Sequence, residues 1–381
     1  MKTRPPLFLG GCLMALAVMA FAQVLIAGEP SSSERWQGPA CGSGDGTAAA
    51  TSRWLILDTG GSGGGFGKGD IRKALGDVFF WNESLGWACG WCGIFKTTDG
   101  GFTWKRMLPP CPVGELWGNI EMTGSRELWI LKYFHGQPKG QLMHSIDDGA
   151  TWREVLPGEL KSATDLYCRL DERWVLCGDF PSYRSEDGGK TWRREGFGGN
   201  FSAIRISIPP SAPYSRLSTV YALGKKGKDY HLRKSVDGGK NWFAIELPAS
   251  VHPELNWRIP CVFFATDRVG WIGTPGGGVL FTGDGGGTWE RRDLPVREDQ
   301  DVTDFWFDQF GRGFASVLNG NISRLSTTVY ESGDYGKTWT PSLSGSKQVS
   351  RFFSLGPGFL WAVGSVVGFV PNDLVAILIR R

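Results

Sequence analysis

The chain has 381 residues, of which 41% are hydrophobic, and a formal net charge of +3. Lys2 and Arg4 are the only charged residues in positions 1–22, so a chain without that segment carries a net charge of +1. A nearly neutral body gives no global attraction to nucleic acid, which would need a basic stripe. The 56 glycines and 18 tryptophans are typical of short strands joined by tight turns, and no apolar pattern with helical spacing continues beyond the N-terminus.

Residues 1–22 are predicted to be an export signal. Lys2 and Arg4 precede an apolar run from Leu7 to about Ala27, and positions 20–22 (Ala-Phe-Ala) offer the small residues of a cleavage site. The run is nearly long enough to span a bilayer, so an uncleaved membrane anchor is the alternative. Residues 23–50 are rich in Ser, Gly, Pro and Ala and are predicted to be a flexible linker. The folded domain is expected over residues 51–381.

Two segments near the start of this domain resemble functional motifs without meeting their requirements. The Gly-rich segment 59–70 has Ser62 and Gly69 where a phosphate-binding loop needs Gly and Ser or Thr. The CGWC segment ends a predicted strand with Cys89–Cys92, whereas a redox pair of this spacing normally begins a helix. We therefore predict neither a phosphate loop nor a redox centre.

A short motif then recurs six times at intervals of 40 to 50 residues. Its frame is Ser or Thr, any residue, Asp, any residue, Gly, any residue, Thr or Asn, and Trp. Gly supplies the positive φ of a hairpin turn, Asp and Ser or Thr bond to the local backbone, and Trp wedges between neighbouring sheets. A catalytic carboxylate need not recur six times, so we interpret the motif as scaffold. Its Asp and Trp residues are Asp99 and Trp104, Asp147 and Trp152, Asp187 and Trp192, Asp237 and Trp242, Asp284 and Trp289, and Asp334 and Trp339.

Each copy of the motif completes a unit of four predicted strands. A strand, a turn and a second strand precede the motif, as in VFFWNESLGWACG from Val78, and the motif joins a third strand to a fourth. After the last copy three strands remain, and Ser52–Asp58 could supply the fourth and close a ring without free sheet edges. The sequence therefore predicts an all-β fold, a seven-bladed β-propeller of four-stranded antiparallel blades, with six blades as the alternative.

The cysteines allow one disulfide prediction. Seven follow the predicted signal, and an odd number leaves at least one unpaired. Cys168 and Cys177 flank a predicted hairpin with its tip at Glu172-Arg173, so these two are the candidate disulfide. The cysteines and the four histidines show no metal-ligand spacing, and we predict no metal and no cofactor.

The repeated motif is identified as the Asp-box, or BNR repeat, of sialidases and related β-propellers. The segment GWACGWCGIFKTTDGGFTW, Gly86–Trp104, most resembles the photosystem II assembly and stability factor family, and the resemblance covers roughly residues 51–381. It implies an exported, non-enzymatic propeller in the periplasm, the thylakoid lumen or an extracellular space. Its expected partner is a membrane protein or the extracytoplasmic segment of one, in the assembly or stability of a membrane complex.

Partner binding is expected on the face that carries the turns between second and third strands, where propellers usually bind ligands. Aromatic residues and cations in these loops are typical of protein interfaces, although a solvated turn is the alternative for the lysines. Arg258 also matches the Arg-Ile-Pro motif of sialidases, but it follows the fourth Asp-box instead of preceding the first. The candidate residues are Trp91, Tyr133, Phe134, Phe180, Tyr183, Lys225, Lys226, Lys228, Arg258 and Arg324.

Two other function classes compete with this interpretation. A sialidase-like glycoside hydrolase would need two acidic groups, or a Tyr/Glu pair, close together at the centre of the ring, with an arginine cluster beside them. No such set can be identified from spacing. A carbohydrate-binding propeller would use exposed tryptophans as stacking platforms, without a catalytic pair.

Overall fold

The computed structural model of the chain describes an all-β domain. It describes residues 53–58, 75–90, 93–108, 115–134, 140–156, 160, 163–169, 172–177, 182–199, 202–209, 219–226, 229–248, 261–318, 327–345, 347–356, 359–366 and 375–380. In these ranges the regular structure is strand, apart from the 3-10 helix η3 (Pro275–Gly277). The predicted signal, the linker and the Gly-rich segment 59–70 lie outside the described residues. The prediction of an all-β fold is confirmed.

Six sheets each contain four consecutive antiparallel strands. Sheet 1 contains β2 (Leu75–Phe80), β3 (Gly86–Gly90), β4 (Gly93–Thr97) and β5 (Lys105–Leu108), and sheet 2 contains β6 (Glu115–Gly124), β7 (Glu127–Phe134), β8 (Gly140–Ser145) and β9 (Arg153–Val155). Sheet 3 contains β10 (Ala163–Arg169), β11 (Glu172–Cys177), β12 (Ser182–Ser185) and β13 (Arg193–Glu195), and sheet 4 contains β14 (Ser202–Ser207), β15 (Val220–Lys226), β16 (Asp229–Ser235) and β17 (Phe243–Ile245). Sheet 5 contains β18 (Cys261–Phe264), β19 (Gly270–Gly273), β20 (Val279–Thr282) and β21 (Glu290–Arg291), and sheet 6 contains β22 (Asp301–Phe307), β23 (Gly313–Leu318), β24 (Thr327–Ser332) and β25 (Thr340–Gly345).

A further four-stranded sheet, sheet 7, combines the two ends of the domain. It contains β26 (Lys347–Gly356), β27 (Phe359–Val366), β28 (Val375–Arg380) and β1 (Arg53–Asp58), in the order β1-β28-β27-β26. β1 pairs with β28 along its whole length, in antiparallel register from Arg53 opposite Arg380 to Asp58 opposite Val375. The predicted closure by the N-terminal strand is therefore confirmed.

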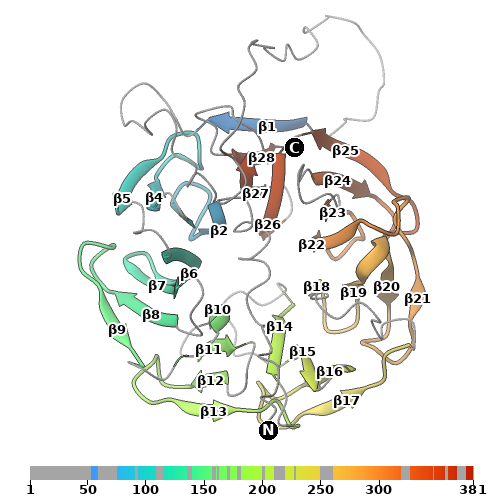
Figure 1. Cartoon of the computed structure of the whole chain (residues 1–381), viewed down its shortest axis with the longest axis horizontal. Helices are drawn as coiled ribbons and strands as arrows, with labels where there is room; N and C mark the ends of the chain where they lie inside the picture. The colour runs from blue at the N-terminus through green and yellow to red at the C-terminus, as the bar shows by residue number, and fades with distance from the viewer. Residues whose placement is uncertain are drawn as a thin grey trace, which may run out of the picture.

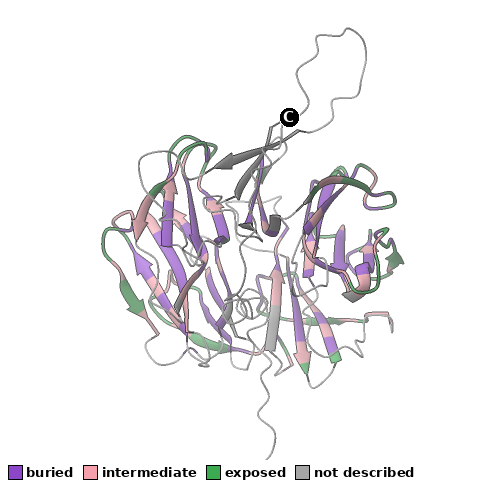
Figure 2. Cartoon of the chain, turned by 45° about the horizontal axis from the view of Figure 1, so that its top comes forward, coloured by how far each residue is buried: buried purple, intermediate pink, exposed green. Residues whose placement is uncertain are grey.

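The sheets stand side by side around a common axis (Figure 1). The first strand of each sheet is its innermost strand, and these strands contact one another in turn, from β2 through β6, β10, β14, β18, β22 and β26 back to β2. Four-stranded antiparallel sheets in a closed ring are the architecture of a β-propeller. Figure 2 shows that the buried residues lie mainly on the inner and middle strands, while exposed residues gather on the outer strands and hairpins.

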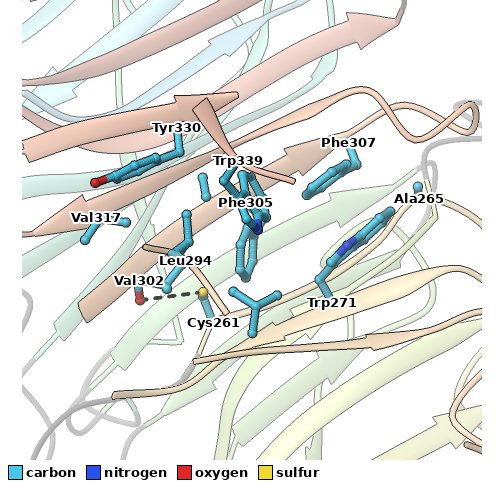
Figure 3. Packing of buried hydrophobic residues seen from close by; sticks show 12 residues of the cluster. Cys261, Ala265, Trp271, Leu294, Val302, Phe305, Phe307, Val317, Tyr330 and Trp339 are labelled. Carbon is cyan, nitrogen blue, oxygen red and sulfur yellow. Dashed lines mark hydrogen bonds between the residues drawn. The ribbon is translucent and has the colours of Figure 1, made fainter. Parts of the chain in front are cut away.

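Within the described ranges the hydrophobic core forms seven clusters, one between each pair of neighbouring sheets. Figure 3 shows the cluster between sheets 5 and 6, where Trp271 stacks on Phe307 with ring centroids 3.8 Å apart. Each cluster buries side chains from two sheets, so the stability of the fold depends on contacts between sheets as well as within them.

A recurrent contact joins most of the Asp-box hairpins to the sheet before them. A glycine of the hairpin packs against a tryptophan in the second strand of the preceding sheet. A Cβ atom added to this glycine would contact the tryptophan, and the pairs are Gly149 with Trp87, Gly189 with Trp129, Gly239 with Trp174, and Gly336 with Trp271. The same contact closes the ring, because Trp361 of sheet 7 donates its Nε1–H to the carbonyl oxygen of Gly100 in sheet 1 (3.0 Å). The Asp-box tryptophans pack at the margins of the same clusters, as Trp104 does beside Phe80.

The six Asp-boxes share one hydrogen-bond pattern, shown here for the box of sheet 4. The hydroxyl of Ser235 donates to Asp237 Oδ1 (2.8 Å) and accepts the amide of Gly239 (2.7 Å). Asp237 Oδ1 also accepts the amide of Asn241 (2.9 Å). Equivalent bonds occur at Asp99, Asp147, Asp187, Asp284 and Asp334. Both carboxylate and hydroxyl are used within the hairpin, which accounts for these residues as scaffold.

The predicted disulfide between Cys168 and Cys177 is wrong. Cys168 is a free, buried cysteine, and the register places it opposite Arg173, while Cys177 lies opposite Ala163. The hairpin turns immediately after Arg169, so two residues equidistant from Glu172-Arg173 in the sequence are not partners across the strands. Cys89 of the CGWC segment is fully buried near the end of a strand, not of a helix.

Candidate functional site

The propeller has two faces with different loops. The Asp-box hairpins and the turns between first and second strands lie on one face, which we call the hairpin face. The turns between second and third strands lie on the other, where the chain also enters each new sheet, and we call this the entry face. Tyr133 and Phe134 end β7, and Lys225 and Lys226 end β15, so all four lie at the entry face as predicted.

Every sheet places a polar residue at an equivalent position of its innermost strand, close to the entry face. In six of the sheets this residue pairs with a second-strand residue, the one that lies two places after the buried aromatic residue of that strand. In sheet 2 the equivalent residue is Asn119, which lies in a bulge. Because the innermost strands form a closed ring, these residues encircle the axis. We call them the central ring: Asp77, Asn119, Asp165, Arg205, Cys261, Asp304 and Arg351.

Ion pairs and hydrogen bonds connect the central ring across the axis. Arg351 contacts Asp77 through Nε (3.2 Å) and Asp165 through Nη1 (3.3 Å). Arg205 Nη1 lies 3.4 Å from the other oxygen of Asp165, and Asn119 donates to Asp165 Oδ1 (2.6 Å). Arg351 and Arg205 keep 31% and 21% of their side chains exposed, so solvent reaches this network.

Burial changes the proton affinity of the ring. It raises the pKa of Asp77 to about 6 against the opposing charge of Arg351, and it raises the pKa of Asp304 to about 6 in the same way. Burial also raises the pKa of the Cys261 thiol, which keeps it protonated. Asp77 additionally accepts the amide of Ile120 in the next sheet (3.0 Å), and Asp304 accepts that of Phe352 (2.8 Å). These two carboxyls therefore also join neighbouring sheets.

An aromatic and cationic group lies beside the ring on sheet 2. The ammonium group of Lys132 lies over the ring of Trp117 (5.5 Å) and over that of Phe134 (5.2 Å). All three side chains are partly exposed. Tyr133 donates its hydroxyl hydrogen to Asn119, which connects the entry face to the central ring. Aromatic side chains around a cation, next to a charged centre, are suited to contacting a polypeptide.

The predicted partner residues do not all belong to this surface. Lys225 lies over the ring of Tyr230 (5.7 Å), and Lys226 is exposed on sheet 4. Tyr183 is only 6% exposed and packs in the core between sheets 2 and 3, so its prediction as a surface contact is wrong. All four residues of β12 are buried, and Tyr183 packs in the cluster that contains Trp129. Trp91, Phe180, Lys228, Arg258 and Arg324 lie outside the described residues.

Sequence reasoning missed the central ring, although the sequence carries a signal for it. Asp77, Asn119, Cys261, Asp304 and Arg351 each precede the buried aromatic residue of the next strand by ten residues. A polar residue at a fixed distance before that aromatic residue therefore marks the ring. Asp165 precedes its tryptophan by nine residues. In sheet 4 the hairpin between the first and second strands is longer, so a fixed spacing to the aromatic residue does not identify Arg205.

No group of three or more His, Cys, Asp or Glu side chains in the described ranges is arranged to hold a metal ion. In that part of the chain, no helix has the length and apolar character needed to cross a membrane.

The chain is similar to a photosystem II assembly factor, as the sequence predicts. It is 27% identical over 291 residues to the photosystem II assembly lipoprotein Ycf48 of Synechococcus sp. (strain CC9902), which covers 72% of this chain and 77% of that protein. No family model matches the chain.

Solved structures show the same fold. A structure of YCF48 bound to a D1 peptide has a TM-score of 0.60 at 17% identity and covers 87% of this chain and 96% of that one. YCF48 from Cyanidioschyzon merolae has a TM-score of 0.57 at 19% identity, with 86% and 98% covered. The GH74 xyloglucanase of Xanthomonas campestris has a TM-score of 0.56 at 13% identity, with 83% of this chain and 53% of that one covered. At such identities the likeness shows the fold alone.

Proposed function

We propose that this chain is an exported, non-enzymatic propeller that binds a segment of a membrane protein and aids the assembly or stability of a photosynthetic membrane complex. The observation that carries the proposal is the similarity to the photosystem II assembly lipoprotein Ycf48 over 72% of this chain and 77% of that protein. The structure of YCF48 with a D1 peptide supports a polypeptide ligand for this type of propeller.

We place the bound segment on the entry face, over the central ring and sheet 2. Trp117, Lys132 and Phe134 supply an aromatic and cationic contact there, and Tyr133 connects it to the ring. Partly exposed aromatic residues of this kind contribute much of the binding energy at protein interfaces. The compartment is the periplasm, the thylakoid lumen or an extracellular space, with the N-terminal segment as signal or anchor.

The glycoside hydrolase alternative has less support from the site. Asp77 and Asp165 share Arg351, so two carboxyl groups do lie close together near an arginine. Their oxygens are occupied, however, by Arg351, Arg205, Asn119 and backbone amides. A catalytic pair needs one group free to donate a proton and another free to attack or activate water. The pair here is built to hold the ring together.

The proposal is tested by capture from solubilised membranes of the source organism. The tagged full chain is expected to retain one membrane protein in stoichiometric amount, identified by mass spectrometry. Phe134→Ala is expected to reduce this capture at least about tenfold, as for an interface hot spot. Phe102→Ala, which removes an exposed phenylalanine from the hairpin face, is the matched control and should capture as the unmodified chain does. Equal loss in both variants, or no specific partner, contradicts the proposal.

A further inference from the structure

A buried histidine lies at the hairpin-face end of sheet 2, outside both the Asp-box and the candidate partner surface. His144 is in β8, is only 4% exposed, and stacks on the ring of Trp129 with centroids 3.8 Å apart. In the strand register it lies opposite Trp129 of β7 on one side and Arg153 of β9 on the other. Its imidazole therefore lies between the second strand and the outer strand of the sheet.

The hydrogen bonds of His144 fix the neutral form of its ring. Nε2 lies 2.8 Å from Oε1 of Glu127, and because a carboxylate can only accept, Nε2 carries the hydrogen. Nδ1 lies 3.2 Å from Nε and 3.0 Å from Nη2 of Arg153, and because a guanidinium group can only donate, Nδ1 is the acceptor. Both nitrogens can keep these partners only while the ring is uncharged.

The same position holds a permanent cation in sheets 1, 3 and 4, where a lysine or arginine lies opposite the buried aromatic residue of the second strand. Each of these cations donates to a group of the following sheet. The pairs are Lys96 with Asp148, Arg184 with the carbonyl oxygens of Gly238 and Gly239, and Lys234 with the carbonyl oxygen of Asp267. His144 differs in two ways: it accepts from a cation of its own sheet, and its charge can change near neutral pH.

Protonation of His144 is incompatible with its contact to Arg153. The added hydrogen occupies the Nδ1 lone pair that accepts the guanidinium, and it brings two positive charges together. Burial is the main cause that lowers the pKa of His144 below its ordinary value of 6.5, and the charges of Arg153 and of Arg173 in sheet 3 act in the same direction. The hydrogen bond and the negative charge of Glu127 oppose the shift.

We infer that the contact between His144 and Arg153 is a pH-sensitive latch that holds the outer strand β9 on sheet 2. When acid protonates His144, the imidazolium keeps Glu127, and Arg153 loses the one side-chain partner that it has in the described ranges. Arg153 is the first of only three residues in β9, so the hairpin-face end of this strand then opens more often. The latch is independent of the proposed function.

The direction of the pH effect follows from the lowered pKa. As the pH falls below about 6.5, the unfolded chain takes up a proton on His144 before the folded chain does. The stability that neutral His144 contributes is therefore complete above this pH. It declines below it, until the folded state also takes up the proton and releases Arg153.

An NMR titration of the full chain measures the protonation of His144 directly. Its imidazole signals, assigned by their absence from His144→Gln, should titrate with a midpoint below 6.5. Arg153→Met should raise this midpoint. Arg126→Met, which removes an exposed guanidinium group from a neighbouring turn of the same sheet, is the matched control and should leave it unchanged. A midpoint at or above 6.5, or equal shifts in the two arginine variants, overturns the inference.

Hydrogen exchange shows whether the latch holds β9. One pH unit below the measured midpoint, the amides of β9 should exchange several-fold faster than one unit above it, after correction for the intrinsic rates. His144→Gln can still accept from Arg153 and donate to Glu127 but does not titrate, so its exchange should stay constant. Arg153→Met should exchange fast at both pH values. Constant exchange in the unmodified chain, an equal increase in His144→Gln, or a ring that stays neutral until the chain unfolds overturns the inference.

Discussion

At the scale of single residues, the Asp-box hydroxyl groups stabilise the hairpins through three hydrogen bonds each, as Ser235 does with the carboxylate and amide of Asp237 and the amide of Gly239. Ser235 is fully buried, donates to Asp237 and accepts the amide of Gly239. Ser235→Ala leaves that amide without an acceptor and should lower the free energy of unfolding by about 1–3 kcal/mol. Urea unfolding measures the change. Ser84→Ala, at an exposed turn, is the control and should change nothing. Equal effects in the two variants would show that the hydroxyl bonds are unimportant.

The pH dependence of stability reports on Asp304. Burial raises its pKa to about 6 in the folded protein from the ordinary value of 3.8. The folded state then holds a proton that the unfolded chain has released, so this group stabilises the fold at low pH. Its contribution is lost as the pH rises from about 4 to about 6, by roughly 1–3 kcal/mol.

Asp304→Asn removes this titration while keeping an oxygen that can accept the amide of Phe352. The free energy of unfolding of the variant, relative to the unmodified chain, should therefore increase between pH 4 and pH 7. Urea unfolding at a series of pH values measures the difference. A difference that stays constant with pH would contradict the shifted pKa of Asp304.

At the scale of elements, a buried arginine joins sheet 3 to the next hairpin. Arg184 of β12 is 1% exposed, lies over the ring of Trp174 (4.3 Å), and donates to the carbonyl oxygens of Gly238 and Gly239. Its charge is matched by Glu186 at 2.7 Å, among other glutamates. This residue makes the contact to the hairpin carbonyls that Trp361 makes elsewhere in the ring.

Arg184→Met would remove the side-chain donor to these two carbonyls and the buried charge that pairs with Glu186. The free energy of unfolding should fall by about 3–5 kcal/mol, as when one partner of a buried ion pair is removed. Arg193→Met, whose side chain is 52% exposed and pairs with the same Glu186, is the matched control and should cost less than about 1 kcal/mol. Thermal unfolding followed by circular dichroism compares them. A similar loss in both would contradict a specific role for Arg184.

The elements themselves could largely be predicted from sequence, because the Asp-box fixes a hairpin and the strands around it alternate regularly. The disulfide failed because the register depends on where the hairpin turns: β10 and β11 turn directly after Arg169, which separates Cys168 from Cys177. The inward orientation of Tyr183 also depends on register, which a one-residue shift reverses.

The site was less predictable than the fold. Its face could be deduced from loop connectivity, and Tyr133 and Phe134 do lie there. The central ring could not be deduced, since Asp77, Asp165 and Arg351 come from strands far apart in the chain and meet only after the ring has closed. Their spacing of nine or ten residues to the following buried aromatic residue has meaning only once the bulges in β2, β10 and β26 are known.

At the scale of the whole molecule, closure by β1 holds the ring together. β1 pairs with β28 along six residue pairs, and without it β28 would present an unpaired edge. A chain beginning at residue 59 should melt several degrees lower and aggregate on concentration, whereas one beginning at residue 51 should behave as the longer chain does. Scanning calorimetry and light scattering check both. Identical behaviour would show that the ring is stable without its closing strand.

The central claim is that a membrane-protein segment binds the entry face near the axis, and photo-crosslinking in native membranes tests it most directly. The full chain would carry benzoylphenylalanine in place of Phe134 on the entry face or of Phe102 on the hairpin face. The account predicts that position 134 crosslinks to one membrane protein and position 102 does not. Crosslinks from position 102 alone, or from neither position to a membrane protein, would contradict it.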